Sequence, residues 1–481
     1  MGVDLDLLSR LLAYGHGRAM RIATHMKTVV QPDALVVSPL SMAGEDATIH
    51  IVAFGRAGQP PEILFVPDPR FREDQYLLFS GLGAAMETYY RACRTAGTHP
   101  QLWVSSAPAV ALLDMLADRL RHFPDDEQVK RLGECLTYAA ERYGVAGQQV
   151  LHAATDVLKL HWATGQHDGE DQHLGSVLTW IDPPRGVNVL EAVFQAQHTP
   201  MGVKTAPEFD TKILAPRIRA YHVARNRGNS PEVIAARAAQ IREVLEPAVR
   251  DIYGAVQKAI AVLCGMGLSP LPGLDRLEER ETREFQRFTD ALDKGVRFPR
   301  RDRPKTAVIK MSIRQDAIRN FDAAVLCGDN LGHLEGMLKG HVLSGMVSKA
   351  LRKPVDRRKY ECRLELVSDQ RNLHVRRGDE LYRMGDSRLC VRVTDVQRQD
   401  GFSRILLHVT KGQKTFSTTW VGTRLDFLRE KPDWDWLRRK RKRISQRLKD
   451  PPWTHEDGIP LPSYPKLRPP DDPIAAVEVL R

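Results

Sequence analysis

The pattern of hydrophobic and polar positions predicts a mixed α/β unit over residues 1–125. Apolar residues recur at helical spacing in three segments, and four short apolar runs are typical of strands. A sheet covered by helices is therefore expected. The expected order is helix, three strands, helix, strand and helix, at residues 4–27, 34–38, 48–54, 62–66, 73–95, 101–105 and 107–121.

The next segment, residues 126–295, has an almost wholly helical pattern and predicts a helical domain. Within it, Ser230 followed by Pro231 is typical of an N-cap and a first helical residue. We expect the helix that begins there to end near Cys264. A basic linker and further helices are expected over residues 296–355.

The pattern then changes to short alternating runs, which predict a small β-barrel over residues 356–425. Gly378-Asp379 and Asp400-Gly401 are turn signals between these runs. Five strands in so short a segment are typical of a closed or nearly closed barrel of the OB or SH3 type. The expected strands are 361–367, 380–384, 389–396, 402–410 and 414–420. A basic helix and a proline-rich tail are expected over residues 426–481.

The composition is that of a globular protein with several domains. Of 481 residues, 42% are hydrophobic and 27% charged, and no apolar run reaches the ~18 residues of a membrane span. Acidic residues stand near the N-terminus, where an export signal needs basic ones, so a cytoplasmic protein is expected. The six cysteines lie far apart and predict reduced thiols.

Positive charge is concentrated in one region of the chain. Residues 351–450 hold 27 Lys and Arg against 14 Asp and Glu, whereas residues 1–350 hold 41 of each. A neutral body joined to a basic region predicts an anionic partner, and the phosphates of DNA or RNA fit that description. The predicted contacts with nucleic acid are Arg376, Arg377, Lys411, Lys414, Trp436, Arg438, Arg439, Lys440, Arg441, Lys442 and Arg443.

Each of these basic segments also has a structural interpretation. The run 438–443 is compatible with a solvated helix whose charges aid solubility, and Trp436 is compatible with either base stacking or burial. The barrel is equally compatible with a structural spacer that has an ordinary charged exterior.

The element order of residues 1–125 is similar to two nuclease folds, the restriction-endonuclease core and the ribonuclease-H-like domain. Both hold divalent metal with carboxylates on strands. The first needs Glu-x-Lys on its third strand, which here reads Glu62-Ile63-Leu64. The second needs an acid within its first strand, and Asp33 only precedes that strand. The unit is therefore expected to be degenerate, with no catalytic residues, bound metal or cofactor.

Other candidate chemistry is weak. No phosphate loop of the form Gly-x-x-x-x-Gly-Lys-Ser/Thr is present. His152, His161, His167 and His173 are nine, six and six residues apart, whereas zinc ligands on a helix are three or four apart. We therefore expect these histidines to belong to a polar loop.

Together, the element order at residues 1–125 and the barrel from Arg377-Gly378-Asp379-Glu380 to Lys411-Gly412 resemble the non-motor parts of bacterial superfamily 1 helicase systems. Such systems join a nuclease-like or degenerate nuclease-like domain to helical regions and a small barrel. The resemblance implies an accessory role beside a separate helicase or other protein subunit.

The leading hypothesis is a non-catalytic accessory protein that binds nucleic acid. Two alternatives stay open. One is a divergent metal-dependent nuclease that uses Asp33, Asp46 or Glu62. The other is a protein-interaction scaffold whose helical middle binds partners.

Overall fold

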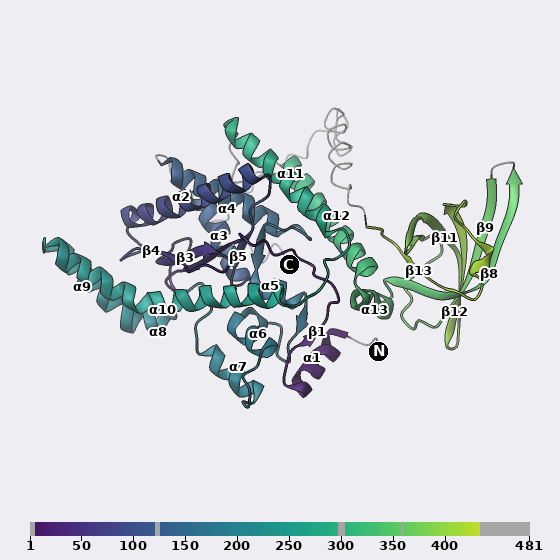
Figure 1. Cartoon of the computed structure of the whole chain (residues 1–481), viewed down its shortest axis with the longest axis horizontal. Helices are drawn as coiled ribbons and strands as arrows, with labels where there is room; N and C mark the ends of the chain where they lie inside the picture. Colours follow the sequence, from purple (N-terminus) through teal and green to yellow (C-terminus); the bar gives the residue numbers. More distant parts are fainter. Residues whose placement is uncertain (1–4, 121–125, 297–303, 357–358, 433–481) are drawn as a thin grey trace, which may run out of the picture. The chain divides into compact units, whose positions relative to one another are not determined.

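The computed structural model describes residues 5–120, 126–296, 304–356 and 359–432 (Figure 1). Its elements form an α/β body, two connecting helices and a β-barrel. None of the helices within the described ranges combines the length and apolar character needed to cross a membrane.

A mixed sheet of five strands lies at the centre of the α/β body. Its order is β4-β3-β2-β5-β6. The first three strands pair antiparallel, whereas β5 and β6 run parallel to β2. The strands are β2 (Leu35–Leu40), β3 (Ile51–Arg56), β4 (Glu62–Phe65), β5 (Leu102–Val104) and β6 (Leu151–Ala153). The four strands predicted in residues 1–125 are confirmed, whereas β6 lies in a segment predicted to be helical.

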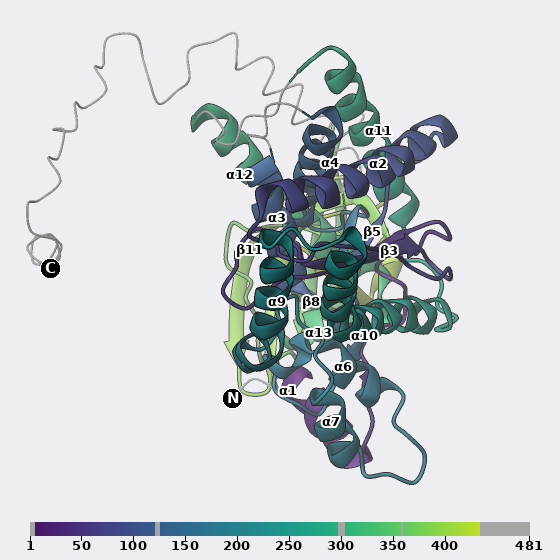
Figure 2. The ribbon, with the colours of Figure 1, turned by 90° about the vertical axis from the view of Figure 1, so that its left-hand side faces the viewer.

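Helices cover both faces of this sheet, which explains why its strands are apolar runs rather than alternating ones. Successive side chains point to opposite faces, so Leu35 and Val37 pack into one core and Val36 into the other. Figure 2 shows helices on either side of the strands. The first core is covered by α2 (Arg72–Ala96), α3 (Ala107–Leu120) and α4 (Glu127–Tyr143), and the second by α5 (Ala154–Lys159), α6 (Leu174–Ile181) and α10 (Pro231–Cys264).

The remaining elements of the body correct one expectation and confirm another. The helix predicted over 4–27 ends at His16, because Gly17 has a φ of 65° and the chain then forms a strand that pairs with β7. The helix predicted from Pro231 to Cys264 is confirmed. These elements are α1 (Leu5–His16), β1 (Met20–Arg21), β7 (Trp162–Ala163), η1 (Glu170–Gln172), α7 (Val189–Gln197), α8 (Pro207–Phe209), η2 (Asp210–Leu214), α9 (Ala215–Asn226) and α11 (Leu274–Asp293).

A buried ion cluster joins α4 to α11. Glu281 on α11 is fully buried and accepts hydrogen bonds from Arg142 of α4, at 2.6 and 2.8 Å, and from Arg280, at 2.9 and 3.1 Å. Although burial favours the neutral acid, the two guanidinium groups hold the pKa of Glu281 below its ordinary value. The carboxylate therefore stays charged and links two helices that cover the first core.

Six strands close into the β-barrel in the order β10-β11-β12-β9-β8-β13. Buried and half-buried positions alternate along its strands, so every second side chain points into the interior. On β12 the buried positions include the apolar residues Ile405, Leu407 and Val409. The elements that lead to it and form it are α12 (Pro304–Gly328), α13 (Asn330–Leu338), β8 (Val342–Asp356), β9 (Lys359–Ser368), β10 (Glu380–Arg383), β11 (Asp386–Gln399), β12 (Phe402–Lys411), η3 (Thr418–Trp420) and β13 (Arg424–Leu428).

Four of the five strands predicted for the barrel are confirmed, and the fifth is wrong. Residues 414–420 form a turn and the short helix η3, and the sixth position in the barrel is taken by β13. The other missed strand is β8, which lies in a segment predicted to be linker and helix and forms a long hairpin with β9. Both missed strands contain glycine or charged residues that interrupt the apolar pattern, and both pair with partners distant in the sequence.

Replacing Glu281 with Gln should destabilise the fold, because it removes the charged carboxylate to which two buried guanidinium groups donate. We expect Glu281→Gln to lower the free energy of unfolding by about 3–5 kcal/mol, measured by urea denaturation. The matched control is Glu279→Gln on the same helix, whose side chain is 56% exposed and lies 3.7 Å from Arg283. The control should cost under ~0.5 kcal/mol, and equal losses in the two variants would contradict this assignment.

Acid should destabilise the α/β body through three buried histidines. Burial lowers the pKa of His50 and His161 to about 4 and that of His152 to about 3. In the unfolded chain these rings take up protons near pH 6.5, whereas in the folded chain they stay neutral until about pH 4. The free energy of unfolding should therefore fall as the pH is lowered from about 6.5 towards 4, by up to ~1.4 kcal/mol per pH unit for each ring.

Urea denaturation at a series of pH values measures this dependence. In His161→Gln one of the three rings is lost, so the slope between pH 5 and pH 6.5 should become shallower by up to ~1.4 kcal/mol per unit. Above pH 7.5 the slopes of variant and wild type should coincide, since the rings are neutral in both states. An unchanged slope in the acidic range would show that His161 does not contribute.

Candidate nucleic-acid interface

The predicted nucleic-acid contacts fall into two groups. Trp436 and the run 438–443 lie outside the described residues. Arg376, Arg377, Lys411 and Lys414 are described, and all four are exposed on the barrel. The first two lie in the connection from β9 to β10, and the other two lie at the end of β12 and in the turn after it.

Many cations of the barrel have no acidic neighbour. Residues 342–432 contain 20 Lys and Arg but only 11 Asp and Glu. Seven of these cations form ion pairs with acids of the barrel, such as Arg424 with Asp369 at 2.9 Å. Among the described residues, no ion pair involves Arg352, Lys353, Arg371, Arg376, Arg377, Arg383, Arg398, Lys411, Lys414 or Lys431. The four predicted contacts therefore belong to the unneutralised set.

Strand pairing sets the distance between the two pairs of predicted contacts. Lys411 lies opposite Cys390 on β11, and the amide of Gly378, next to Arg377, donates to the carbonyl of Val393 on the same strand. The two pairs are therefore on opposite sides of β11 and about three residues apart along it, or ~14 Å from strand spacings. They form one broad basic surface rather than a single cluster.

One acid lies within this basic surface. Glu380 accepts a hydrogen bond from Arg392 at 2.7 Å, which lowers its pKa, and the charge of Lys411 adds to the effect. Because Glu380 is exposed, water screens this pair and leaves most of the positive charge of the surface available to other anions.

Beside this surface the barrel forms a pocket of about 510 Å³. It lies between the β9–β10 connection, the end of β11 and the residue after β13. The pocket contains three guanidinium groups and one carboxylate above two buried apolar side chains. Its lining includes Leu373, Val375, Arg376, Asp379, Arg398 and Arg429.

Asp379 organises this pocket. Its Oδ2 accepts a hydrogen bond from the amide of Arg376, at 2.8 Å, and pairs with the guanidinium of Arg429, also at 2.8 Å. Arg398 donates to the carbonyl of Leu373 at 3.1 Å. The connection from β9 to β10 is therefore held in place by two arginines from other strands, both of which keep unused donors.

The sequence analysis identified only Arg376 among the cations of this pocket. Arg398 and Arg429 are 31 residues apart in the sequence and come together because the barrel closes. Neither stands in a cation run or near a tryptophan, so no local signal distinguishes them.

Hydroxyl groups occupy the edge of the α/β sheet where ligands bind in folds of this class. In open α/β sheets that site lies beyond the carboxyl ends of the parallel strands. Ser41 follows β2, Ser105 and Ser106 follow β5, and Thr155 lies two residues after β6. All four are buried. A divalent metal needs several carboxylates here. The acid next to these hydroxyl groups, Asp156, accepts a hydrogen bond from the Tyr143 hydroxyl.

Two acids near this edge are hydrogen-bonded to neighbouring residues. Asp68 lies 2.7 Å from Nε2 of His222 and accepts the amide of Arg70 at 2.9 Å. Asp210 accepts the amide of Ala43 at 2.8 Å. Within the described ranges, no three residues among His, Cys, Asp and Glu are grouped so that they could hold a metal ion.

The acids of the nuclease alternative do not converge. Asp33 lies 3.5 Å from Arg56. Asp46, in the loop after β2, lies 2.6 Å from Lys204. Glu62 is the first residue of β4. Because β3 lies between β4 and β2, Glu62 is at least two strand spacings, or ~10 Å, from β2. Asp33 and Asp46 are at opposite ends of β2, so the three cannot share one ion.

The histidines singled out in the sequence have separate structural contacts. His152 is buried against the Trp103 ring, with centroids 4.8 Å apart. His161 accepts the amide of Lys27 through Nε2 at 3.1 Å, and His173 caps α6 by accepting the amide of Ser176. His167 is exposed in a turn, where its ring accepts the amide of Gly169.

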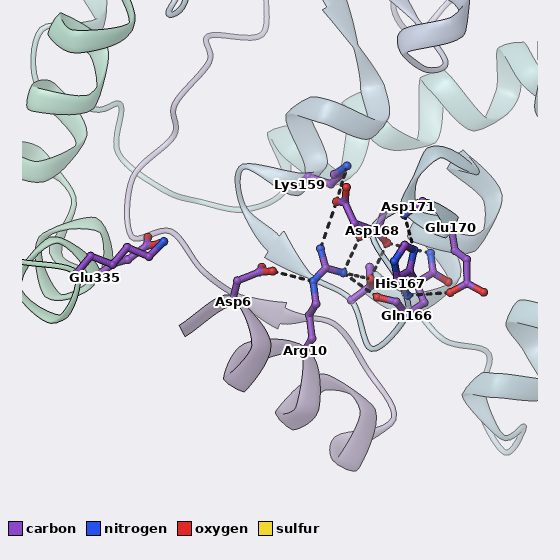
Figure 3. A network of polar contacts seen from close by, with 12 residues as sticks. Asp6, Arg10, Lys159, Gln166, His167, Asp168, Glu170, Asp171 and Glu335 are labelled. Atoms are coloured by element: carbon purple, nitrogen blue, oxygen red, sulfur yellow. Dashed lines mark hydrogen bonds and ion pairs between the residues drawn. The ribbon is translucent and has the colours of Figure 1, made fainter. Parts of the chain in front are cut away.

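The acids beside His167 surround an arginine rather than a metal. Figure 3 shows Arg10 of α1 reaching into the loop that follows β7. Its guanidinium lies 2.9 Å from Asp171 and 3.5 Å from Asp168, and Lys159 also pairs with Asp168 at 2.9 Å. These contacts hold α1 against the loop and leave the acids neutralised.

Divalent metal should therefore not stabilise this protein. We expect the unfolding temperature of the full chain to be the same with Mg²⁺, with Mn²⁺ and with a chelator, since a ligand stabilises only the state that binds it. Thermal denaturation provides the measurement. An increase with Mn²⁺ that is abolished by Asp33→Asn, Asp46→Asn or Glu62→Gln would revive the nuclease alternative.

Comparisons with known proteins do not assign this chain to a family. No family model matches it, and no curated protein and no solved structure is significantly similar to it.

Proposed function

We propose that this chain is a nucleic-acid-binding accessory protein that works without catalysis of its own, beside a separate helicase or nuclease. The observation that carries the proposal is the excess of exposed cations on the barrel that have no acid within ion-pair distance among the described residues. Such cations gain most from a polyanion, because phosphates release condensed counterions when Lys and Arg replace them.

The α/β body supports the non-catalytic part of the proposal. We propose that it is a ribonuclease-H-like domain, because an antiparallel set of three strands followed by two strands parallel to the first has that order. Such a domain needs an acid within its first strand, and β2 reads Leu-Val-Val-Ser-Pro-Leu. With Ser38 there and hydroxyl groups at the strand ends, the body is better suited to a structural or docking role.

Salt-dependent binding by a charge-reduced variant tests this function. We would change Arg376, Arg377, Lys411 and Lys414 together to Gln and measure the affinity of the full chain for single- and double-stranded DNA and RNA between ~50 and ~200 mM salt. We expect the affinity to fall by at least ~10-fold at the lower salt, and the slope of log K against log salt to become shallower by up to ~3.6.

A matched control removes the same charge from the body. Arg91, Lys212, Arg242 and Arg250 are exposed and each is paired with an acid four residues away, so their joint replacement by Gln should leave the slope nearly unchanged. Equal effects of the two variants would contradict the proposal, because binding would then depend on net charge and not on the barrel. A third variant, with residues 438–443 changed to Ser, measures what the C-terminal run adds.

A scaffold role predicts a different result. Partners captured with the full chain would then survive nuclease treatment and would be insensitive to the barrel substitutions. Loss of those partners after nuclease treatment supports nucleic acid as the link.

A further inference from the structure

The pocket on the barrel differs from the rest of the basic surface because two of its three cations are held in place. Arg429 pairs with Asp379 and Arg398 donates to the carbonyl of Leu373, whereas Lys411 and Lys414 have no such anchor among the described residues. Side chains that are already ordered lose less rotamer entropy when a ligand binds. The pocket is therefore suited to a specific anion, and the surrounding surface to a diffuse one.

We propose that this pocket binds the terminal phosphate of a nucleic-acid strand, an inference that rests on the proposed function and names the part of the strand that is recognised. Arg376, Arg398 and Arg429 supply three positive charges and Asp379 one negative charge. The remaining charge of about +2 matches a terminal phosphate, which carries about −1.5 to −2 at pH 7. A phosphodiester within a strand carries only one negative charge.

The donors in the pocket also match a phosphate. Each guanidinium has five N–H groups in a planar fork that binds phosphate oxygens in pairs. Arg429 uses one nitrogen, Nη2, which donates to Asp379 and to the carbonyl of His374. Arg398 also uses one nitrogen, which donates to the carbonyl of Leu373, so the remaining nitrogens of both side chains are available for a ligand. The side chain of Arg376 forms no ion pair with another described residue, so its whole fork can face the ligand.

The lining of the pocket argues against recognition of a base. Its described residues include no aromatic side chain on which a base could stack, apart from the exposed ring of His374. Leu373 and Val375 are each 5% exposed and form an apolar floor that offers a base no hydrogen-bond donor from its side chains. Sequence-independent recognition of a strand end follows from this lining.

Oligonucleotides that differ only at their ends test this inference. We would measure binding of the full chain to one single-stranded sequence with a 5′-phosphate, with a 3′-phosphate, or with hydroxyl groups at both ends. The phosphate-bearing strand that fits the pocket should bind about 10-fold more tightly than the hydroxyl-ended strand, since several charge-assisted hydrogen bonds are added. The two phosphorylated strands distinguish which end is recognised.

Substitutions in the pocket should remove this preference without abolishing general binding. In Arg398→Gln the ratio between phosphorylated and hydroxyl-ended strands should fall below ~3, and Arg398→Lys should restore it only in part because the planar fork is lost. The matched control is Arg388→Gln on the same strand, whose side chain is 77% exposed, pairs with Asp386 and does not line the pocket. The control should keep the full ratio.

Each outcome separates this inference from the proposed function. Equal binding of all three oligonucleotides, or equal effects of Arg398→Gln and Arg388→Gln, would overturn the pocket assignment and leave the basic surface as the binding site. Tight binding of only a phosphorylated strand would support the pocket and count against the broad surface. Failure of all three to bind would overturn both.

Discussion

Closure of the barrel is the constraint that organises the basic end of this protein. The pairing of β10 with both β11 and β13 leaves no open edge. On every strand, alternate side chains therefore point into the same closed interior. In a barrel of six strands that interior is filled by apolar side chains, and charged residues must point outward. With 20 cations and 11 acids between residues 342 and 432, an uncompensated positive exterior is unavoidable.

The α/β body solves the opposite electrostatic problem. Several of its carboxylates are paired with nearby cations, from the buried Glu281 between two arginines to Asp171 beside Arg10. A catalytic metal centre requires carboxylates that converge and still have free lone pairs. In the described part of the body these acids hold helices and loops together, and hydroxyl groups lie at the carboxyl ends of the parallel strands.

One carboxylate holds the pocket of the barrel together. This carboxylate, Asp379, fixes the backbone of Arg376 and the side chain of Arg429 at the same time. Removing any of these groups changes both the shape and the charge of the pocket. The pocket therefore depends on the relative positions of its side chains, whereas the wider surface depends only on an excess of positive charge.

Local sequence determined which segments are buried, and therefore much of the secondary structure. Apolar runs predicted the four strands of the body that lie in residues 1–125, and period-two alternation predicted four strands of the barrel. The cap at Ser230-Pro231 predicted where α10 begins. The charge count also predicted which region is basic, because net charge does not depend on how the chain folds.

Tertiary structure alone decided which strands pair and which distant residues come into contact. The three-residue β6 carries too little pattern to predict, and it is a strand because β5 offers an open edge. The strand β8 was missed although its hairpin partner β9 follows directly, because glycine and charged residues interrupt its apolar pattern. The strand β13 was missed because its partners β8 and β10 lie ~80 and ~45 positions earlier in the chain, which no local period encodes. For the same reason the sequence predicted Arg376 as a contact residue but did not bring Arg398 and Arg429 next to it. Periodicity reports burial, whereas the contacts that build a pocket depend on packing between segments distant along the chain.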